Sequence, residues 1–408
     1  MRAIIGMRWV QVSALAMLVV AGVLVLPAYG GKSGGAQSFT IDVDGHNPKA
    51  NEAFLAYYPN TVRVHPGDTV TFHEVGNGEP HTVTLGSLTN NVVAAFDKLT
   101  PKQQQGTPPK SFLKLDAAVP QLLPQGPGDA IQSGANPCFV DSGSPPAKAA
   151  CPKRSQPDFT GKESYYNSGW LDSNAKFTVH LSSSIAPGTY RFMCLLHREG
   201  MTGKIVVVPS STSVPSPSAQ FAAGQKVLQQ TEAKLQPALT ALRRGKPPIP
   251  VTLPGQNPVL AGSGSNSVQE AEITEFGPSK VSIPVGGSVT WYLIGPHSIT
   301  FNSDKSNDDI RTVAKDGSVH LNPKALAPAN SPGEPAPKGG GGGSSNAPKF
   351  KVVASTRWNG AGFHNSGVFA NSFGPPLIEG YKITFTRAGK YKYICTVHDD
   401  MKGEVDVG

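Results

Sequence analysis

Two short segments of the chain combine side chains that could bind a soft metal ion. Each holds a cysteine, then a histidine, then a methionine: Cys194, His197 and Met201 in the first, and Cys395, His398 and Met401 in the second. A thiolate and a thioether suit Cu(I), and an imidazole suits both copper oxidation states. This order of donors on one short loop indicates a redox-active copper site in each half of the chain.

A histidine far upstream in each half supplies the donor that such a site still lacks. His81 is followed by Thr82, and His297 is followed by Ser298. Two imidazoles and a thiolate in one plane, with a weak axial thioether, make up a type 1 (blue) copper site. We therefore predict one copper in each half, with Thr82 and Ser298 supporting the ligand histidines. The predicted ligands are His81, Cys194, His197 and Met201 in one site, and His297, Cys395, His398 and Met401 in the other.

These donors belong to an internal repeat of the whole chain. Three blocks recur in the same order: residues 59–72 and 278–291, the Asn-Ser-Gly triplets at 167–169 and 365–367, and residues 188–208 and 389–408. In the first block, apolar residues alternate around a central glycine, which predicts two half-buried strands joined by a turn. Three blocks in one order indicate two copies of one domain.

The predicted fold class is all-β, with two tandem copies of one domain at about 37–209 and 267–408. Residues 210–266 form the expected linker. Within it, apolar residues at helical spacing predict one amphipathic helix at about 218–244, with a kink at Pro237 as one option. The apolar stripe of this helix could pack on a domain or bind a separate partner.

Each predicted domain carries a long insertion, at about 87–165 and at about 326–346. The second is rich in glycine and proline, and we expect a surface loop there. The first contains Cys138 and Cys151, which we expect to form a disulfide in an exported protein.

Residues 1–30 have the pattern of an export signal. Arg2 and Arg8 precede an apolar stretch, and small residues stand at Ala28 and Gly30. A cleaved signal is one interpretation, and an uncleaved membrane anchor through residues 9–28 is the other. Either one places the domains outside the cytoplasm: in the periplasm, in the extracellular space or on the outer face of the cytoplasmic membrane.

At the first block and in the last third of each domain, the chain resembles the cupredoxins, the group of plastocyanin, amicyanin and pseudoazurin. The spacing of Cys395, His398 and Met401 is similar to the short amicyanin-type ligand loop, whereas the first domain has one more residue between His197 and Met201. The resemblance implies that each domain is a Greek-key β-sandwich. It also implies a protein that passes single electrons between redox protein donors and acceptors.

The resemblance also implies how electrons would enter and leave. The ring edges of His197 and His398 would be the electron ports, and Leu195, Leu196 and Val397 would help form an apolar docking patch around them. Neither the insertions nor the linker helix is covered by this resemblance.

A copper enzyme is the main alternative to an electron carrier. Copper oxidases and nitrite reductases resemble this chain in having tandem cupredoxin domains, but they add a second kind of copper held by His-x-His pairs or by a histidine next to the cysteine. Here Cys194 lies between Met193 and Leu195, and no His-x-His pair occurs. The sequence therefore favours a carrier over an enzyme, because it shows no ligands for a type 2 or trinuclear copper site.

Copper storage or delivery is a further alternative, but the exposed methionine- or histidine-rich tracts typical of it are missing. The formal net charge of +8 comes from scattered bases, and nothing resembles a nucleic-acid footprint. Six histidines lack a partner motif and are assigned to no metal: His46, His65, His73, His180, His320 and His364.

Overall fold

The structure is a computed structural model of the chain. It describes residues 35–47, 49–76, 80–105, 108–120, 156–246, 253, 255–265, 268–303, 311–313, 319–326, 349–368, 377–398 and 400–408. The predicted export signal, the predicted Cys138–Cys151 disulfide and residues 327–346 of the second insertion lie outside these residues. Within the described ranges, no helix has the length and apolar character needed to cross a lipid bilayer.

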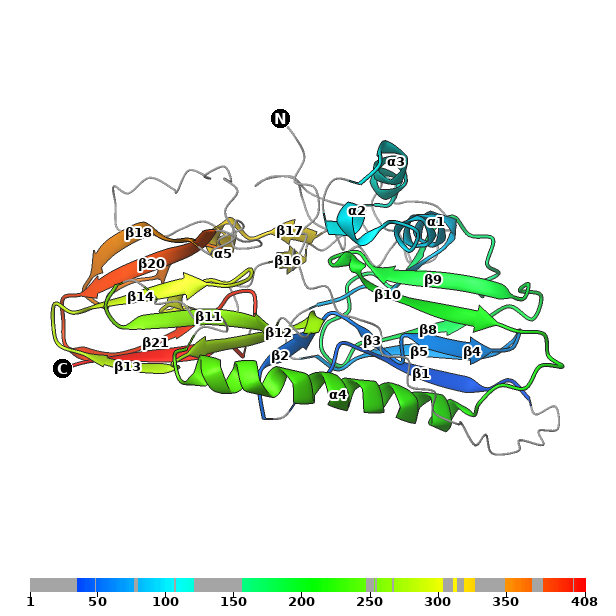
Figure 1. The fold of residues 1–408 in the computed structure, drawn as a ribbon, viewed down its shortest axis with the longest axis horizontal. Coiled ribbons are helices and arrows are strands. Elements are labelled where there is room, and N and C mark those ends of the chain that lie inside the picture. The colour runs from blue at the N-terminus through cyan, green and yellow to red at the C-terminus, as the bar shows by residue number, and fades with distance from the viewer. Residues whose placement is uncertain are drawn as a thin grey trace.

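The first domain is a sandwich of two sheets (Figure 1). One sheet has the order β3 (Tyr57–Tyr58), β1 (Ser38–Val43), β5 (Thr69–Glu74), β8 (Lys176–His180). The other has the order β4 (Thr61–Val64), β10 (Arg198–Val207), β9 (Gly188–Cys194), β6 (Thr84–Leu85), β7 (Tyr166–Asn167). The predicted turn between β4 and β5 therefore carries the chain from one sheet to the other.

The second domain repeats this architecture. Its first sheet has the order β18 (Lys349–Trp358), β20 (Leu377–Phe385), β14 (Ser288–Leu293), β11 (Pro258–Ser265), β12 (Val268–Gly277), β2 (Glu52–Phe54). Its second sheet has the order β13 (Lys280–Ile283), β22 (Lys402–Val407), β21 (Gly389–Ile394), β15 (Thr300–Phe301), β19 (His364–Asn365). This second sheet matches that of the first domain strand for strand. Strand β11 belongs to this sandwich although it precedes residue 267, the predicted start of the domain.

Aromatic side chains at equivalent positions fill the two cores. In the first domain, the rings of Phe72 and Phe192 meet edge to face with centroids 4.9 Å apart. In the second, Trp291 and Tyr393 occupy the same positions and meet edge to face at 5.3 Å. Such pairs stabilise a core beyond the area that they bury. Each cysteine of the predicted copper sites belongs to the same buried cluster as its aromatic pair.

A single long helix, α4 (Pro217–Arg243), runs along both sandwiches (Figure 1). Its first turn is capped by the Ser216 side chain, which accepts a hydrogen bond from the Ala219 amide at 3.2 Å. At 27 residues it is about 40 Å long, and it continues as one helix through Pro237.

The buried side of α4 contacts both domains. Leu235 packs with Phe54, Tyr58 and Ala271, and Leu239 belongs to another cluster, with residues of β11 and β12. The apolar stripe therefore packs on the domains, which was one of the two interpretations of the sequence. Val227, which the helical spacing placed in this stripe, is 52% exposed instead.

Strand β2 of the first half crosses into the second domain. It pairs antiparallel with β12, and Ala53 stands opposite Glu272. Next to it, the Asn51 carbonyl accepts a hydrogen bond from the Thr274 amide at 2.9 Å. The Asn51 side chain donates to the Asp400 carbonyl at 2.7 Å. The first half thus contributes an edge strand to a sheet of the second domain.

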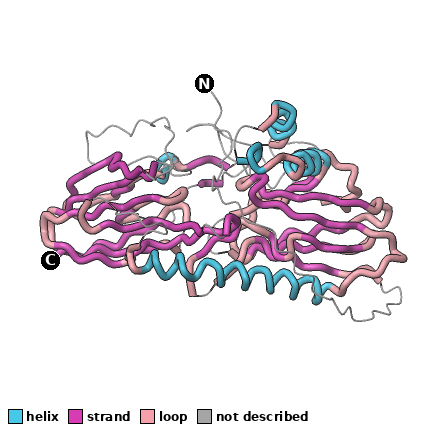
Figure 2. Tube along the Cα trace, in the orientation of Figure 1, coloured by secondary structure: helices cyan, strands magenta, loops and turns pink. Residues whose placement is uncertain are grey.

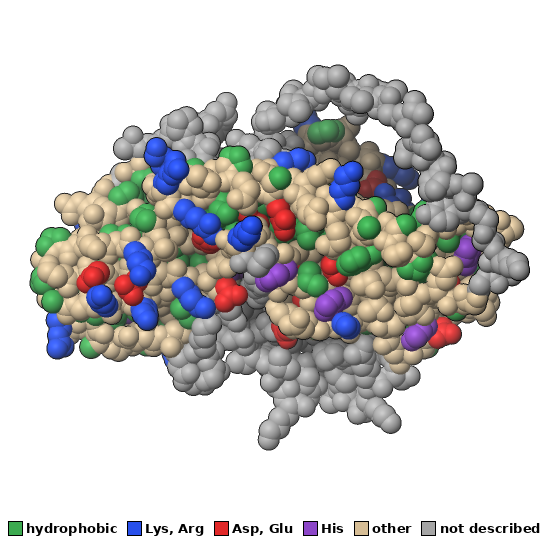
Figure 3. All heavy atoms as spheres, turned by 90° about the horizontal axis from the view of Figure 1, so that it is seen from below, with side chains coloured by type: hydrophobic (Ala, Val, Ile, Leu, Met, Phe, Trp, Pro, Cys, Tyr) green, Lys and Arg blue, Asp and Glu red, His purple; other side chains and the backbone are tan. Residues whose placement is uncertain are grey.

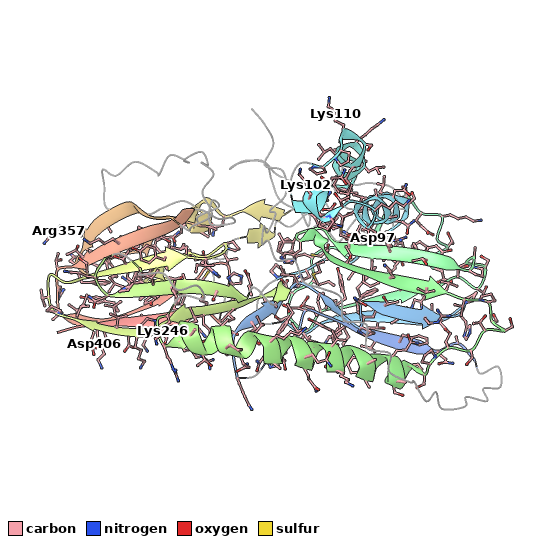
Figure 4. All side chains as sticks on the ribbon, in the orientation of Figure 1. Asp97, Lys102, Lys110, Lys246, Arg357 and Asp406 are labelled. Atoms are coloured by element: carbon pink, nitrogen blue, oxygen red, sulfur yellow. The ribbon has the colours of Figure 1, made fainter. Side chains whose placement is uncertain are left out.

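The described part of the first insertion and the segment before the second include regular elements. The first holds α1 (Ser87–Phe96), α2 (Pro101–Gln105) and α3 (Lys110–Ala118), which stand on the outside of the first sandwich (Figure 2). The charged side chains of Lys102 and Lys110 lie on this projecting part (Figure 4). Between β15 and β18, the structure describes the pair β16 (Arg311–Val313) and β17 (Val319–Leu321) and the short helix α5 (Pro323–Leu326).

Candidate metal centres

The first site forms where β9 meets the segment before β6. His81 forms a bridge with Leu171, and Cys194 is the last residue of β9. The ligand atoms of His81, Cys194 and His197 all lie within 4.8 Å of one another. His81 Nδ1 lies 3.7 Å from Cys194 Sγ. The structure therefore brings together three of the four donors that the sequence predicted for this site.

The second site has the same plan. His297, Cys395 and His398 also hold their ligand atoms within 4.8 Å of one another. Cys395 Sγ lies 3.9 Å from His297 Nδ1 and 3.8 Å from His398 Nδ1. The two Nδ1 atoms are 3.1 Å apart. Three electron-pair donors thus converge on one point.

These separations fit a bound metal ion. With bonds of roughly 2.3 Å to sulfur and 2.0–2.1 Å to imidazole at trigonal angles, the sulfur–nitrogen separation is about 3.8 Å. The observed values in the two sites are 3.7, 3.8 and 3.9 Å. Two imidazoles and one thiolate are the planar donor set of a type 1 copper site. The donor types and these sulfur–nitrogen separations therefore fit copper.

The predicted axial methionines are fully buried beside these donors. Met201 and Met401 have 0% exposure, and each belongs to the same cluster as the cysteine of its domain. In the second loop, the Met401 amide donates to the His398 carbonyl at 3.0 Å, and the Cys395 amide donates to the Met401 carbonyl at 3.0 Å. These bonds close the loop on itself and hold the backbone of Met401 next to His398 and Cys395.

The surroundings of both cysteines favour the thiolate form. Burial alone would raise the pKa of the Cys395 thiol, but hydrogen bonds and charge from His297 and His398 outweigh burial and hold the pKa well below its usual value. The Ser298 and Val397 amides also donate to Cys395 Sγ, each at 3.4 Å. In the first site, the pKa of Cys194 is likewise held well below its usual value against burial, by His197 and His81. The thiolate is the form that binds a metal.

Thr82 and Ser298, predicted as supports, tie each upstream histidine to the cysteine loop. The Thr82 hydroxyl accepts a hydrogen bond from the Leu195 amide at 2.7 Å, and its own amide donates to Cys194 Sγ at 3.4 Å. The Ser298 hydroxyl accepts from the Thr396 amide at 2.9 Å. These bonds fix the distance between the ligand histidine and the ligand cysteine.

The repeated Asn-Ser-Gly triplet holds the same segment from the other side. The Thr84 hydroxyl donates to Asn167 Oδ1 at 2.8 Å, and the Val83 amide donates to Ser168 Oγ at 2.8 Å. The second domain repeats both bonds, from Thr300 to Asn365 at 2.9 Å and from Ile299 to Ser366 at 2.8 Å. The sequence showed the repeat of this triplet, and the structure supplies its role.

The two sites differ behind the upstream histidine. His297 Nε2 donates to the Ile294 carbonyl at 3.0 Å. His81 Nε2 instead faces the buried carboxylate of Asp44, 3.3 Å from Oδ2. Glu74 is buried beside them, with ligand atoms of all three residues within 4.8 Å. Burial raises the pKa of Asp44 and raises that of Glu74 well above its usual value, although His81 lowers both. No sequence motif pointed to Asp44 or Glu74.

The predicted electron ports and docking patch need correction. His398 is 2% exposed, so its ring is not a surface port, whereas His197 is partly exposed. Leu195 is also 2% exposed, because it packs in one cluster with residues of α1 and α3. Arg198 ties α3 to the ligand loop by an ion pair with Asp116. The insertion therefore covers part of the surface that the resemblance assigned to docking.

Charge and the remaining histidines add no further site. Basic side chains are spread over the α4 face of the molecule rather than gathered in one patch (Figure 3). Among the side chains that the structure describes, the groups able to hold a metal include none of the histidines outside the two centres. His364 is buried, and its Nε2 lies 2.7 Å from the Tyr381 hydroxyl.

Comparison with known proteins gives similarity at the level of structure only. No family model matches the chain, and no curated protein matches it. Among solved structures, a dithionite-reduced auracyanin from Roseiflexus castenholzii is 20% identical, covering 43% of this chain and 100% of its own, with a TM-score of 0.22. A purple cupredoxin from Nitrosopumilus maritimus is 13% identical, covering 42% and 99%, with a TM-score of 0.17. Auracyanin A from Chloroflexus aurantiacus, described as a blue copper protein, is 17% identical, covering 43% and 100%, with a TM-score of 0.20. The structural neighbours of this chain thus include cupredoxins, each spanning less than half of it.

Proposed function

We propose that the protein is a two-site type 1 copper protein that transfers single electrons. The observation that carries the proposal is the pair of Cys–His–His sets with matching geometry, in which every residue except the partly exposed His197 is buried. We further propose that Met201 and Met401 are axial ligands. Copper bound at such a site supplies a one-electron couple between Cu(II) and Cu(I).

The protein's own residues make this exchange favourable by staying fixed. The hydroxyls of Thr82 and Ser298 accept hydrogen bonds from amides of the cysteine loops, and these bonds hold the donors at their distances before any ion is bound. Both cysteines and both methionines are fully buried, which keeps water away from the ligand sulfurs. A site that is already arranged needs little reorganisation when its charge changes, which favours fast electron transfer over chemistry on a bound substrate.

Several finer parts of the proposal rest on the sequence. We propose that the domains work outside the cytoplasm, after export through residues 1–30, with redox proteins as donors and acceptors. We also propose that the protein is a carrier rather than an oxidase or nitrite-reductase-like enzyme. A purified two-copper protein that reduces nitrite or oxygen rapidly without a partner protein would overturn this last part.

Copper loading of the purified chain tests the proposal. We expect two coppers per chain, an intense blue colour from thiolate-to-copper charge transfer, and loss of the colour on addition of a reductant. Cys194→Ser and Cys395→Ser should each remove one copper and about half of the colour. Fewer than two coppers, or two coppers without the charge-transfer band, would contradict the assignment.

A matched control separates site loss from cysteine loss in general. Cys138 and Cys151 stand apart from both loops in the sequence. The double variant Cys138→Ser and Cys151→Ser should therefore keep both coppers and the full colour. Electron paramagnetic resonance of the four proteins then counts the type 1 signals directly.

A further inference from the structure

The second site is closed to solvent at the histidine that would serve as its port. His398 is 2% exposed, and its Nε2 lies 3.6 Å from Oε1 of Glu272, which is itself 4% exposed. Glu272 belongs to β12, the strand that pairs with β2 of the first half. The buried ring of His398 therefore faces the junction of the two domains.

The first site is connected to the same junction through Asp44. His81 Nε2 lies 3.3 Å from Asp44 Oδ2. The other oxygen of this carboxylate, Oδ1, accepts hydrogen bonds from the amides of Gly45 and Phe54, each at 2.6 Å. Phe54 is the last residue of β2. The carboxylate of Asp44 thus connects a ligand histidine of the first site to the strand shared by the domains.

The backbone conformation of Asp44 indicates that surrounding contacts hold this residue in place. Asp44 has a φ of 65°, in the left-handed region that residues other than glycine rarely adopt, and it is fully buried. Backbone strain of this kind persists only where surrounding contacts hold it. Here the contacts are the two amide donors and the ring of His81.

Together these contacts form a continuous path between the two sites. It runs from His81 to Asp44, through a hydrogen bond to the Phe54 amide, across the strand pair at Ala53 and Glu272, and on to His398. Every step is a covalent bond, a strand pairing or a contact of 3.6 Å or less. An electron tunnels further through such connected atoms than across open gaps.

We propose that this path carries electrons between the two sites, and that the second site receives its electrons through the first. The inference rests on the proposed copper occupancy of both sites. With copper bound at both sites, an electron from an external one-electron donor would enter at the first site, near the partly exposed His197, and would move along the path to the second site. The first copper would then be Cu(II) again and the second would be Cu(I). One electron moves and no bond is made or broken.

Stopped-flow reduction of the copper-loaded full chain by hexaammineruthenium(II) tests the path. In the unaltered protein, both sites should bleach at rates set by the first site. In the Cys194→Ser protein, which keeps only the second site, bleaching should be slower by about an order of magnitude or more. In Glu272→Ala, half of the colour should bleach fast and half at the slow rate of Cys194→Ser.

Glu275→Ala is the matched control. Glu275 also lies on β12 and joins the domains, through a 3.1 Å hydrogen bond from the Asn51 amide and an ion pair with Arg243, but it is not on the path. This variant should bleach like the unaltered protein. Spectroelectrochemical titration of each protein shows whether the driving force has changed, so that a slower rate can be assigned to the path.

The outcomes separate the two proposals. If Cys194→Ser bleaches as fast as the unaltered protein, the second site is reached directly and the inference is wrong, although the copper assignment stands. If Glu272→Ala keeps both coppers and a single fast phase, the path is wrong. If Glu272→Ala loses its second copper, Asp44→Ala is used instead, because it interrupts the path at the other end. A slow bleaching phase in Asp44→Ala then supports the path, and its absence contradicts the path. If the chain binds no copper, the proposed function itself is wrong.

Discussion

Protonation of His364 is expected to control the acid stability of the second domain. This histidine is buried on β19, where its ring stacks on Trp358 at 5.2 Å and its Nε2 lies 2.7 Å from the Tyr381 hydroxyl. Burial lowers its pKa from 6.5 to about 4. Its neighbour Asn365 accepts the hydrogen bond that steadies the segment after His297. Loosening of β19 at acid pH would therefore reach the second metal centre.

The size of the effect follows from linkage. A histidine with a pKa of about 4 when folded and about 6.5 when unfolded binds its proton more readily in the unfolded chain. Stability from this group is fully present above about pH 6.5 and is lost as the pH falls through about 4. The loss is roughly 2 kcal/mol at pH 5 and approaches roughly 3 kcal/mol near pH 4.

Urea unfolding of the copper-free chain, followed by tryptophan fluorescence, measures this loss. We compare the unaltered protein with His364→Gln, which cannot take up the proton. The variant is less stable at pH 7.5 because it loses packing on Trp358, but the difference should narrow by roughly 2 kcal/mol at pH 5. His180→Gln, which replaces an exposed histidine, should show a smaller change. A difference between unaltered protein and His364→Gln that is the same at both pH values would refute the reasoning.

Three further substitutions test the site and the junction. Gly262→Ala should lose the second copper, as measured by metal analysis, because a Cβ at this position overlaps His297 Nε2. Gly286→Ala is the control: Gly286 has a similar φ but open space around it, so this variant should keep both coppers. Thr82→Val removes the acceptor of a buried amide, which should destabilise the first domain by about 1–3 kcal/mol in urea unfolding and alter its charge-transfer band. Leu235→Ala should cost about 2–5 kcal/mol, because this fully buried side chain packs α4 against both halves, and unchanged unfolding would contradict that role.

The sequence predicted the metal donors well because their chemistry is local and repeated. Cys395, His398 and Met401 lie on one loop, and the first domain repeats the same order. A long-range pairing such as His81 with Cys194 could be predicted only because both halves place a histidine at the matching position. The repeat also predicted two copies of one domain, and the resemblance added the sandwich. The structure shows the second sheet of each domain with equivalent strand order.

What the sequence did not reveal depends on contacts between distant segments. Asp44 and Glu272 belong to no motif, and only the folded chain shows that each faces a ligand histidine. The burial of His398 and Leu195 could not be predicted either, because it comes from neighbouring segments that the repeat does not contain. The strand β2 is too short for its alternation to indicate a partner sheet.

The passage of β2 into the second domain has a consequence for how the chain can be divided. If the chain were cut between the repeats, β12 would become an outer strand with unpaired amides and carbonyls, ready to pair with another molecule. A fragment containing only the second repeat should therefore self-associate, although it carries all the ligands of its site. The boundary between the sequence repeats is therefore not the boundary between independent folding units.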